Sequence, residues 1–333
     1  MLIIIAILAM VVVKALAESP WGLFTIAMTI PIAIFMGIYM RFIRPGRVGE
    51  ASIIGFVLLI LAIHYGSVIA ADPYWAKIFT LEAPTLAIVM MAYGFIASVL
   101  PVWFLLAPRD YLSTFLKIGV IVVMAVAIVL VAPDLQMPKA NTQYFDGTGP
   151  VFAGGIFPFL FITIACGAIS GFHALISSGT TPKMLENETH ALTVGYGSML
   201  AESAVAIMAL ICACILHPGL YFAINSSSAL IGTDVVNVVQ TISNWGFSIT
   251  PEEITTLTTN IGEHTILSRT GGAPTFAIGV ALILHKLFGG VDLMAFWYHF
   301  AILFEALFIL TAVDAGTRAC RFMVQDILGN VYK

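Results

Sequence analysis

Long apolar runs alternate with short polar segments along almost the whole of this chain. A helix needs about 20 apolar residues to cross the hydrocarbon core of a bilayer. About nine runs reach or approach this length, and we predict a membrane helix in each. The runs are Leu2–Leu16, Trp21–Phe42, Ile53–Ala70, Pro84–Leu106, Ser113–Val131, Gly154–Ile176, Leu192–Leu216, Ala273–Leu287 and Leu293–Ala312. The pattern therefore predicts a single all-α domain over residues 1–333, a polytopic membrane helix bundle.

The polar segments between the runs predict an orientation. Arg41, Arg44 and Arg47 follow the second run, and the positive-inside rule makes this a cytoplasmic loop. The long polar stretch 217–272 is then a non-cytoplasmic loop. Nine simple crossings would leave Arg318 and Arg321 outside, against the same rule. We therefore expect either an extra crossing or re-entrant segment within 217–272, or one late run that does not cross.

Composition supports a membrane protein and excludes several other classes. Hydrophobic residues make up 60% of the chain and charged residues 10%, with a mean hydropathy of +1.02. Soluble domains carry about 45–50% apolar and about 25% charged residues. The net charge is −4, and no basic cluster could follow a phosphate backbone, so we predict no nucleic-acid partner.

Motifs for cofactors and enzymatic chemistry are missing from the sequence. It has no Gly-rich phosphate loop, no His-Glu-x-x-His zinc motif and no paired-cysteine site. Three of the four cysteines lie in apolar runs, and we interpret them as packing residues. We therefore predict no cofactor, no metal and no enzymatic activity.

One apolar run, from Phe157 to Lys183, fills with Gly, Ser, Thr and a single His after Ile164. Gly167 and Gly171 form a small-xxx-small pair, which by itself predicts close helix packing. The alternative is a helix that unwinds near the membrane midplane, where freed backbone groups and hydroxyls bind substrate, as in secondary transporters. On that reading the substrate-binding candidates are Gly167, Ser170, Gly171, Ser177, Ser178 and Thr180, and His173 carries a proton.

Two glutamates, Glu202 and Glu305, lie inside apolar runs and are further candidates for proton coupling. A carboxylate in the bilayer core costs roughly 2.5–3.5 kcal/mol on insertion scales, so each should face the bundle interior. A purely structural, hydrogen-bonded role is the alternative for both. We interpret Asp314 and Arg318, four residues apart, as a helical ion pair, and His299 as an interfacial residue.

Four stretches closely resemble the carbon starvation protein A family. They are "PWGLFTIAMTIPIAIFMGIYMRFIRPGRVGEASIIG", "LPVWFLLAPRDYLSTFLKIG", "LFITIACGAISGFHALISSGTTPKML" and "FWYHFAILFEALFILTAVDAGTR". The resemblance runs from about residue 2 to about residue 330. Typical members are considerably longer, so it implies that the chain is an internal part of a longer protein.

The resemblance also implies a fold and a function. Family members are bacterial inner-membrane proteins of the amino acid–polyamine–organocation superfamily, so a LeuT-like bundle with discontinuous helices is expected. The implied activity is proton-coupled uptake of peptides or of a small carboxylate such as pyruvate during carbon starvation. The expected partners are thus the small-molecule substrate, protons and the lipid bilayer, and the number of subunits is left open.

Two other function classes fit the residues. The first is a membrane sensor or scaffold that responds to nutrients without transporting them. The second is a membrane-embedded hydrolase with Ser170 as nucleophile, although Ala168 stands where the Gly-x-Ser-Gly pattern of rhomboid proteases has its first glycine.

Overall fold

A computed structural model of the chain describes residues 2–17, 19–101, 103–152, 154–158, 161, 174–177 and 185–331. Every regular element in these ranges is a helix, which confirms the all-α prediction. Among the described residues, five helices are long and apolar enough to cross a membrane: Pro20–Ile43, Val48–Ala71, Ala107–Val131, His190–Cys214 and Val291–Asn330. A sixth span is formed if the bent pair Pro73–Phe79 and Ala83–Val99 is counted as one. The protein is therefore a membrane helix bundle.

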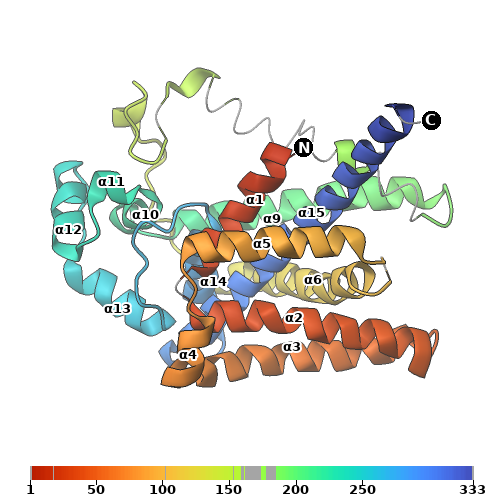
Figure 1. Cartoon of the computed structure of the whole chain (residues 1–333). Coiled ribbons are helices and arrows are strands. Elements are labelled where there is room, and N and C mark those ends of the chain that lie inside the picture. Colours follow the sequence, from red (N-terminus) through yellow and green to blue (C-terminus); the bar gives the residue numbers. More distant parts are fainter. Residues whose placement is uncertain are drawn as a thin grey trace.

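Most of the described helices are joined by short connections, and the 262–272 connection is longer (Figure 1). Their bounds are α1 Leu2–Leu16, α2 Pro20–Ile38, α3 Val48–Ala71, α4 Pro73–Phe79, α5 Ala83–Val99, α6 Leu106–Val131, α9 His190–Cys214, α10 Pro218–Asn225, α11 Ser228–Ile231, α12 Val235–Asn244, α13 Pro251–Ile261, α14 Ala273–Leu287 and α15 Met294–Val331. A π-helical turn, Tyr39–Ile43, extends α2.

Local sequence explains where the functionally important helices begin and end. Ser19 caps α2, since its hydroxyl accepts the Gly22 amide, and Pro20 occupies the first helical position. Thr250 and Glu253 form a reciprocal capping box at the start of α13. Gly262 ends α13 in the left-handed region with φ 71°, a conformation that glycine adopts without steric cost.

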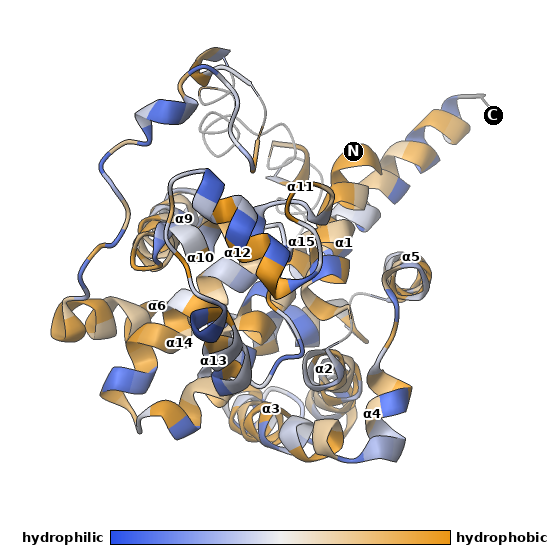
Figure 2. Ribbon diagram, turned by 90° about the vertical axis from the view of Figure 1, so that its left-hand side faces the viewer, coloured by the Kyte–Doolittle hydropathy of each residue, from blue (hydrophilic) through white to orange (hydrophobic). Residues whose placement is uncertain are grey.

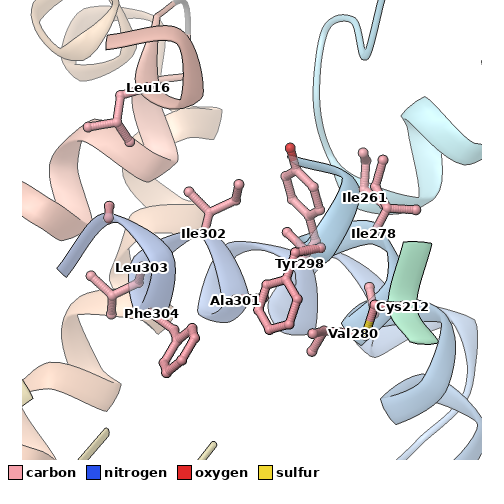
Figure 3. Close-up of a cluster of buried hydrophobic side chains, with 14 of the residues drawn as sticks. Leu16, Cys212, Ile261, Ile278, Val280, Tyr298, Ala301, Ile302, Leu303 and Phe304 are labelled. Carbon is pink, nitrogen blue, oxygen red and sulfur yellow. The ribbon is translucent and has the colours of Figure 1, made fainter. Parts of the chain in front are cut away.

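Helix α15 forms the centre of the bundle. It packs against α14, α1, α5, α6 and α2, while α2 and α3 lie side by side at one edge (Figure 1). Tyr298 and Phe304 of α15 are the largest of the fully buried side chains. Figure 3 shows this core gathered along α15, with Cys212 approaching from α9 and Ile261 from the end of α13.

The bundle has two chemically different ends. At one end, α10–α13 gather near the start of α2 and the end of α3 (Figure 1). Figure 2 looks onto this end, where hydrophilic residues lie on α12 and α13, whereas α3 is mostly apolar. Large apolar side chains such as Phe95 and Val129 remain exposed on the outer helices, as expected of a lipid-facing surface.

The opposite end collects arginines, and we call it the arginine end. The Arg41 guanidinium lies 4.0 Å from the Trp103 ring centroid, and Arg321 donates to the Ser98 carbonyl at 2.6 Å. Arg321 therefore lies at the same end of the bundle as Arg41, whereas nine simple crossings would place the two residues at opposite ends. The stretch 217–272 forms four short helices, none of which reaches the length of a membrane span. The cytoplasmic location of the arginine end stays a prediction.

Candidate functional site

Most of the predicted substrate site lies outside the described residues. This applies to Gly167, Ser170, Gly171, His173, Ser178 and Thr180. Ser177 is described, is exposed, and donates its hydroxyl to the Ala174 carbonyl at 3.0 Å within one helical turn.

The two predicted membrane carboxylates have different surroundings. Glu202 is exposed on α9, and Glu305 is half-buried in the first half of α15. Within the described ranges, neither carboxylate has a hydrogen bond or an ion pair. The structure therefore does not join these two groups into one site, and their role in proton coupling stays a prediction.

A buried ionic cluster lies instead at the α10–α13 end, and we call it the Glu263 cluster. It consists of Ser19, Glu263, Arg269 and His299. The Ser19 hydroxyl donates to Glu263 Oε1 at 3.0 Å, and Arg269 Nη2 donates to Oε2 at 3.0 Å. His299 Nε2 lies 3.3 Å from Oε1. The side chains of Glu263, Arg269 and His299 are 3%, 7% and 1% exposed, so all three are withdrawn from water.

Three chain segments supply the residues of the Glu263 cluster. Glu263 directly follows Gly262, the residue that ends α13, and Ser19 is the cap of α2. Arg269 lies in the connection to α14, which is held to α10 by a bond from the Ser268 amide to the Ala223 carbonyl at 3.0 Å. The cluster thus joins α2, the 262–272 connection and α15.

Aromatic rings surround the cluster from α2 and α15. The Trp21 ring stacks on the His299 imidazole with centroids 3.9 Å apart and 12° between the planes. Tyr298 is fully buried, and its hydroxyl finds no well-aligned partner among the described residues. The same holds for Arg269 Nη1 and His299 Nε2. The Tyr298 hydroxyl nevertheless lies close enough to Arg269 to help raise the pKa of that guanidinium, so these two groups interact with each other.

The electrostatics of the cluster favour its ionised form. Burial alone would raise the pKa of the Glu263 carboxyl, but His299, Arg269 and Ser19 outweigh burial, and the pKa is lowered. Burial would lower the pKa of Arg269, but the facing Glu263 carboxylate outweighs it, and the pKa is raised. Glu263 and Arg269 are therefore a charged pair.

A second buried ionic cluster lies near the arginine end, and we call it the Asp314 cluster. Asp314 Oδ2 accepts from Arg109 Nη1 at 3.1 Å and from the Tyr93 hydroxyl at 2.9 Å. Lys117 Nζ donates to Thr311 Oγ1 at 3.2 Å, one turn before Asp314 on α15. These contacts join α5, α6 and α15, and the side chains of Arg109 and Asp314 at their centre are 3% and 1% exposed.

Two interpretations from the sequence are wrong. Asp314 does not pair with Arg318 but with Arg109, more than 200 positions away. Arg318 donates to the carbonyls of Ala97 and Leu100, at the C-terminal end of α5. His299 is not interfacial but buried in the Glu263 cluster.

Sequence reasoning missed Glu263 and Arg269 because both lie in a stretch taken for a polar loop. The available signal was a carboxylate directly after the helix-ending Gly262, followed within six residues by an arginine. Neither ionic cluster has the ligands for a metal site, since no group of three or more His, Cys, Asp or Glu side chains gathers anywhere in the described chain.

Comparison with known proteins identifies the family. The model of the family "Carbon starvation protein CstA" matches residues 1–333. A peptide transporter CstA of Campylobacter jejuni is 98% identical over 333 residues, which are 100% of this chain and 47% of that protein. One from Helicobacter pylori (strain J99) is 71% identical over 325 residues, covering 98% of this chain and 47% of that protein.

A relative with a different name is the pyruvate/proton symporter BtsT of Escherichia coli (strain K12). It is 58% identical over 352 residues, which cover 99% of this chain and 49% of that protein. No solved structure matches. The chain spans about half the length of the curated relatives it matches. The match over the full 333 residues nevertheless shows that the chain belongs to the carbon starvation protein CstA family.

Proposed function

We propose that this chain is part of a secondary active transporter in the bacterial inner membrane. It imports peptides or a small carboxylate such as pyruvate, together with protons, when carbon is scarce. The observation that carries the proposal is the similarity along nearly the whole chain to proteins named as peptide transporters and as a pyruvate/proton symporter.

The buried ionic clusters support transport as the function. Ionisable groups inside a membrane bundle are costly, and they typically line substrate or proton pathways. Here the two clusters lie near opposite ends of the bundle, and both include residues of α15. His299 and Asp314 are 15 positions apart, which is about 22 Å along a helix.

This arrangement suits alternating access. Transporters open one side at a time by moving one group of helices against another. If α15 is released from the Glu263 cluster at one end and from the Asp314 cluster at the other, it can rock between two packed positions. Each cluster would then act as a latch that closes one side of the substrate path.

The substrate site itself remains the one proposed from the sequence. Gly167, Ser170, Gly171, Ser177, Ser178 and Thr180 would bind the substrate carboxylate through backbone amides and hydroxyls. His173, Glu202 and Glu305 are the corresponding candidates for proton transfer. Half-buried Glu305 is supported by its position on α15 between the two ionic clusters.

Uptake into proteoliposomes tests the proposal. The protein is reconstituted with any flanking sequence of its reading frame, and uptake of labelled pyruvate and of a labelled dipeptide is measured with and without an inward proton gradient. One-to-one symport of a proton with a monoanion gives about tenfold accumulation per pH unit of gradient. If uptake is the same with and without the proton gradient, coupling of transport to protons is contradicted. If the protein binds substrate specifically but does not transport it, a nutrient sensor is supported instead.

A further inference from the structure

His299 and Glu263 face each other in a way that determines where a proton must lie. His299 Nδ1 lies 2.9 Å from the Ala295 carbonyl, one turn earlier on α15. A carbonyl oxygen can only accept, so Nδ1 carries a hydrogen. A neutral imidazole has a single N–H, and its Nε2 would therefore present a lone pair.

That nitrogen lies beside an electron-rich atom. Nε2 is 3.3 Å from Glu263 Oε1, at ion-pair distance but without the alignment of a hydrogen bond, and Oε1 already accepts the Ser19 hydroxyl. A neutral imidazole nitrogen and a carboxylate oxygen repel each other at this distance, whereas a protonated ring attracts the oxygen. One proton more than a neutral imidazole and an ionised carboxylate supply therefore makes this contact attractive.

The surroundings assign this proton to the histidine. The Glu263 carboxylate accepts from Ser19 and Arg269, and both hydrogen bonds favour its charged form. The Trp21 ring stacked on His299 favours a cationic imidazole through its π face. The occupied state is thus an imidazolium and a guanidinium on either side of one carboxylate.

Other ionisable groups near the cluster do not replace His299 in this role. Tyr298 and Arg269 are buried beside Glu263, and both keep their protons at neutral pH. Lys14 of α1 donates to Thr270 at 2.6 Å, next to Arg269, and adds positive charge. His264 is exposed beside Glu263, which places the cluster close to the aqueous surface from which a proton arrives.

We propose that the contact between His299 Nε2 and Glu263 Oε1 is a proton-binding site that couples proton movement to the position of α15. The inference rests on the proposed function and names residues for its proton step. An N–H bond forms at Nε2 when a proton arrives from water at the α10–α13 end. When that proton leaves, the attraction between the ring and the carboxylate is lost, and α15 separates from the 262–272 connection.

Nitrogen NMR of histidine tests the site without any transport assay. The protein is labelled with ¹⁵N-histidine, reconstituted in lipid bilayers and measured at neutral pH, and the His299 signals are assigned by their loss in His299→Gln. We expect two N–H groups on His299, and a single N–H at Nδ1 in Glu263→Gln. A single N–H in the unsubstituted protein, or two in Glu263→Gln, would overturn the assignment.

Transport by matched variants tests the coupling. His285 of α14 makes the same contact to the carbonyl four residues earlier, Ala281, at 2.9 Å, but has no acidic partner in the described structure. We expect His299→Gln to exchange labelled for unlabelled pyruvate while losing the roughly tenfold accumulation per pH unit, and His285→Gln to retain both.

The outcomes separate this inference from the proposed function. If the unsubstituted protein moves no substrate, the proposed function fails, while the NMR result on His299 stands by itself. If His299→Gln still accumulates substrate with the gradient as the unsubstituted protein does, His299 is not the coupling residue even though transport is confirmed. Retained exchange in His299→Gln also shows that this variant is folded.

Discussion

Replacing Asp314 by alanine isolates the energetic role of the ionic cluster near the arginine end. The substitution leaves the Arg109 guanidinium, only 3% exposed, without its carboxylate, and it removes the acceptor of the Tyr93 hydroxyl. Breaking a buried pair by removing one partner costs about 3–5 kcal/mol, because the remaining charge is neither solvated nor paired. The equilibrium between folded and unfolded protein should therefore shift by about two to four orders of magnitude.

The assay is reversible unfolding in mixed micelles, with the folded fraction followed by tryptophan fluorescence. The control is Arg44→Ala, which breaks an exposed ion pair with Glu50, 3.2 Å apart. Exposed pairs contribute about 0–1 kcal/mol, so this variant should unfold close to the unsubstituted protein. The double variant Arg109→Met/Asp314→Leu should recover most of the loss, because neither charge remains to be buried.

The comparison of these variants can refute the reasoning. If Asp314→Ala costs no more free energy of unfolding than Arg44→Ala, Arg109 must find another partner or water, and the cluster is not a latch between α6 and α15. If the double variant is as unstable as Asp314→Ala, the loss comes from packing rather than from an unpaired charge.

Two further predictions concern helix packing and pH. A Cβ at Gly279 would lie 2.5 Å from Cys212 Cβ and 2.6 Å from the Cys212 carbonyl oxygen. Gly279→Ala should therefore lower the free energy of unfolding by about 1–3 kcal/mol. The control Gly119→Ala, at a helix position with open space around it, should raise the free energy of unfolding by about 0.5–1 kcal/mol. The pKa of Glu263 in the folded protein is lowered below its value of about 4.3 in the unfolded chain. The Glu263 carboxylate therefore contributes its full stabilisation above about pH 4.3, and this stabilisation is lost as the pH falls through the folded-state pKa. The free energy of unfolding, measured from about pH 6 to about pH 3, should fall with pH for this reason. Glu263→Gln should show a weaker dependence of the free energy of unfolding on pH, and the control Glu50→Gln should show the same dependence as the unsubstituted protein.

Hydropathy alone predicted most of the helices because membrane spans must be long and apolar. The runs Trp21–Phe42 and Ile53–Ala70 correspond to α2 with its π-helical extension and to α3, within a few residues at each end. Hydropathy did not predict the helices of a segment that is polar and yet folded. The stretch 217–272 forms four helices whose apolar residues, such as Phe222 and Ile242, are buried against the bundle.

Pairing between distant residues was the second failure. Asp314 and Arg318 are close in sequence, and on a helix they are neighbours, so a local pair was the natural prediction. In the folded chain, Arg109 approaches Asp314 from α6, and Arg318 reaches carbonyls at the end of α5 instead. Helix periodicity determines which residues share a face but not which other helix covers that face.

The sequence by itself determined that this chain is a membrane helix bundle, and its motifs indicated the CstA family. Apolar length and motif identity are properties of consecutive residues, so they can be recognised without coordinates. Only the tertiary structure brought Ser19, Glu263, Arg269 and His299 into one buried cluster. These residues come from segments up to 280 positions apart in the sequence. A buried charge has no water to solvate it, so it is stabilised by whichever opposite charge the fold places next to it, and that neighbour is known only from the tertiary structure.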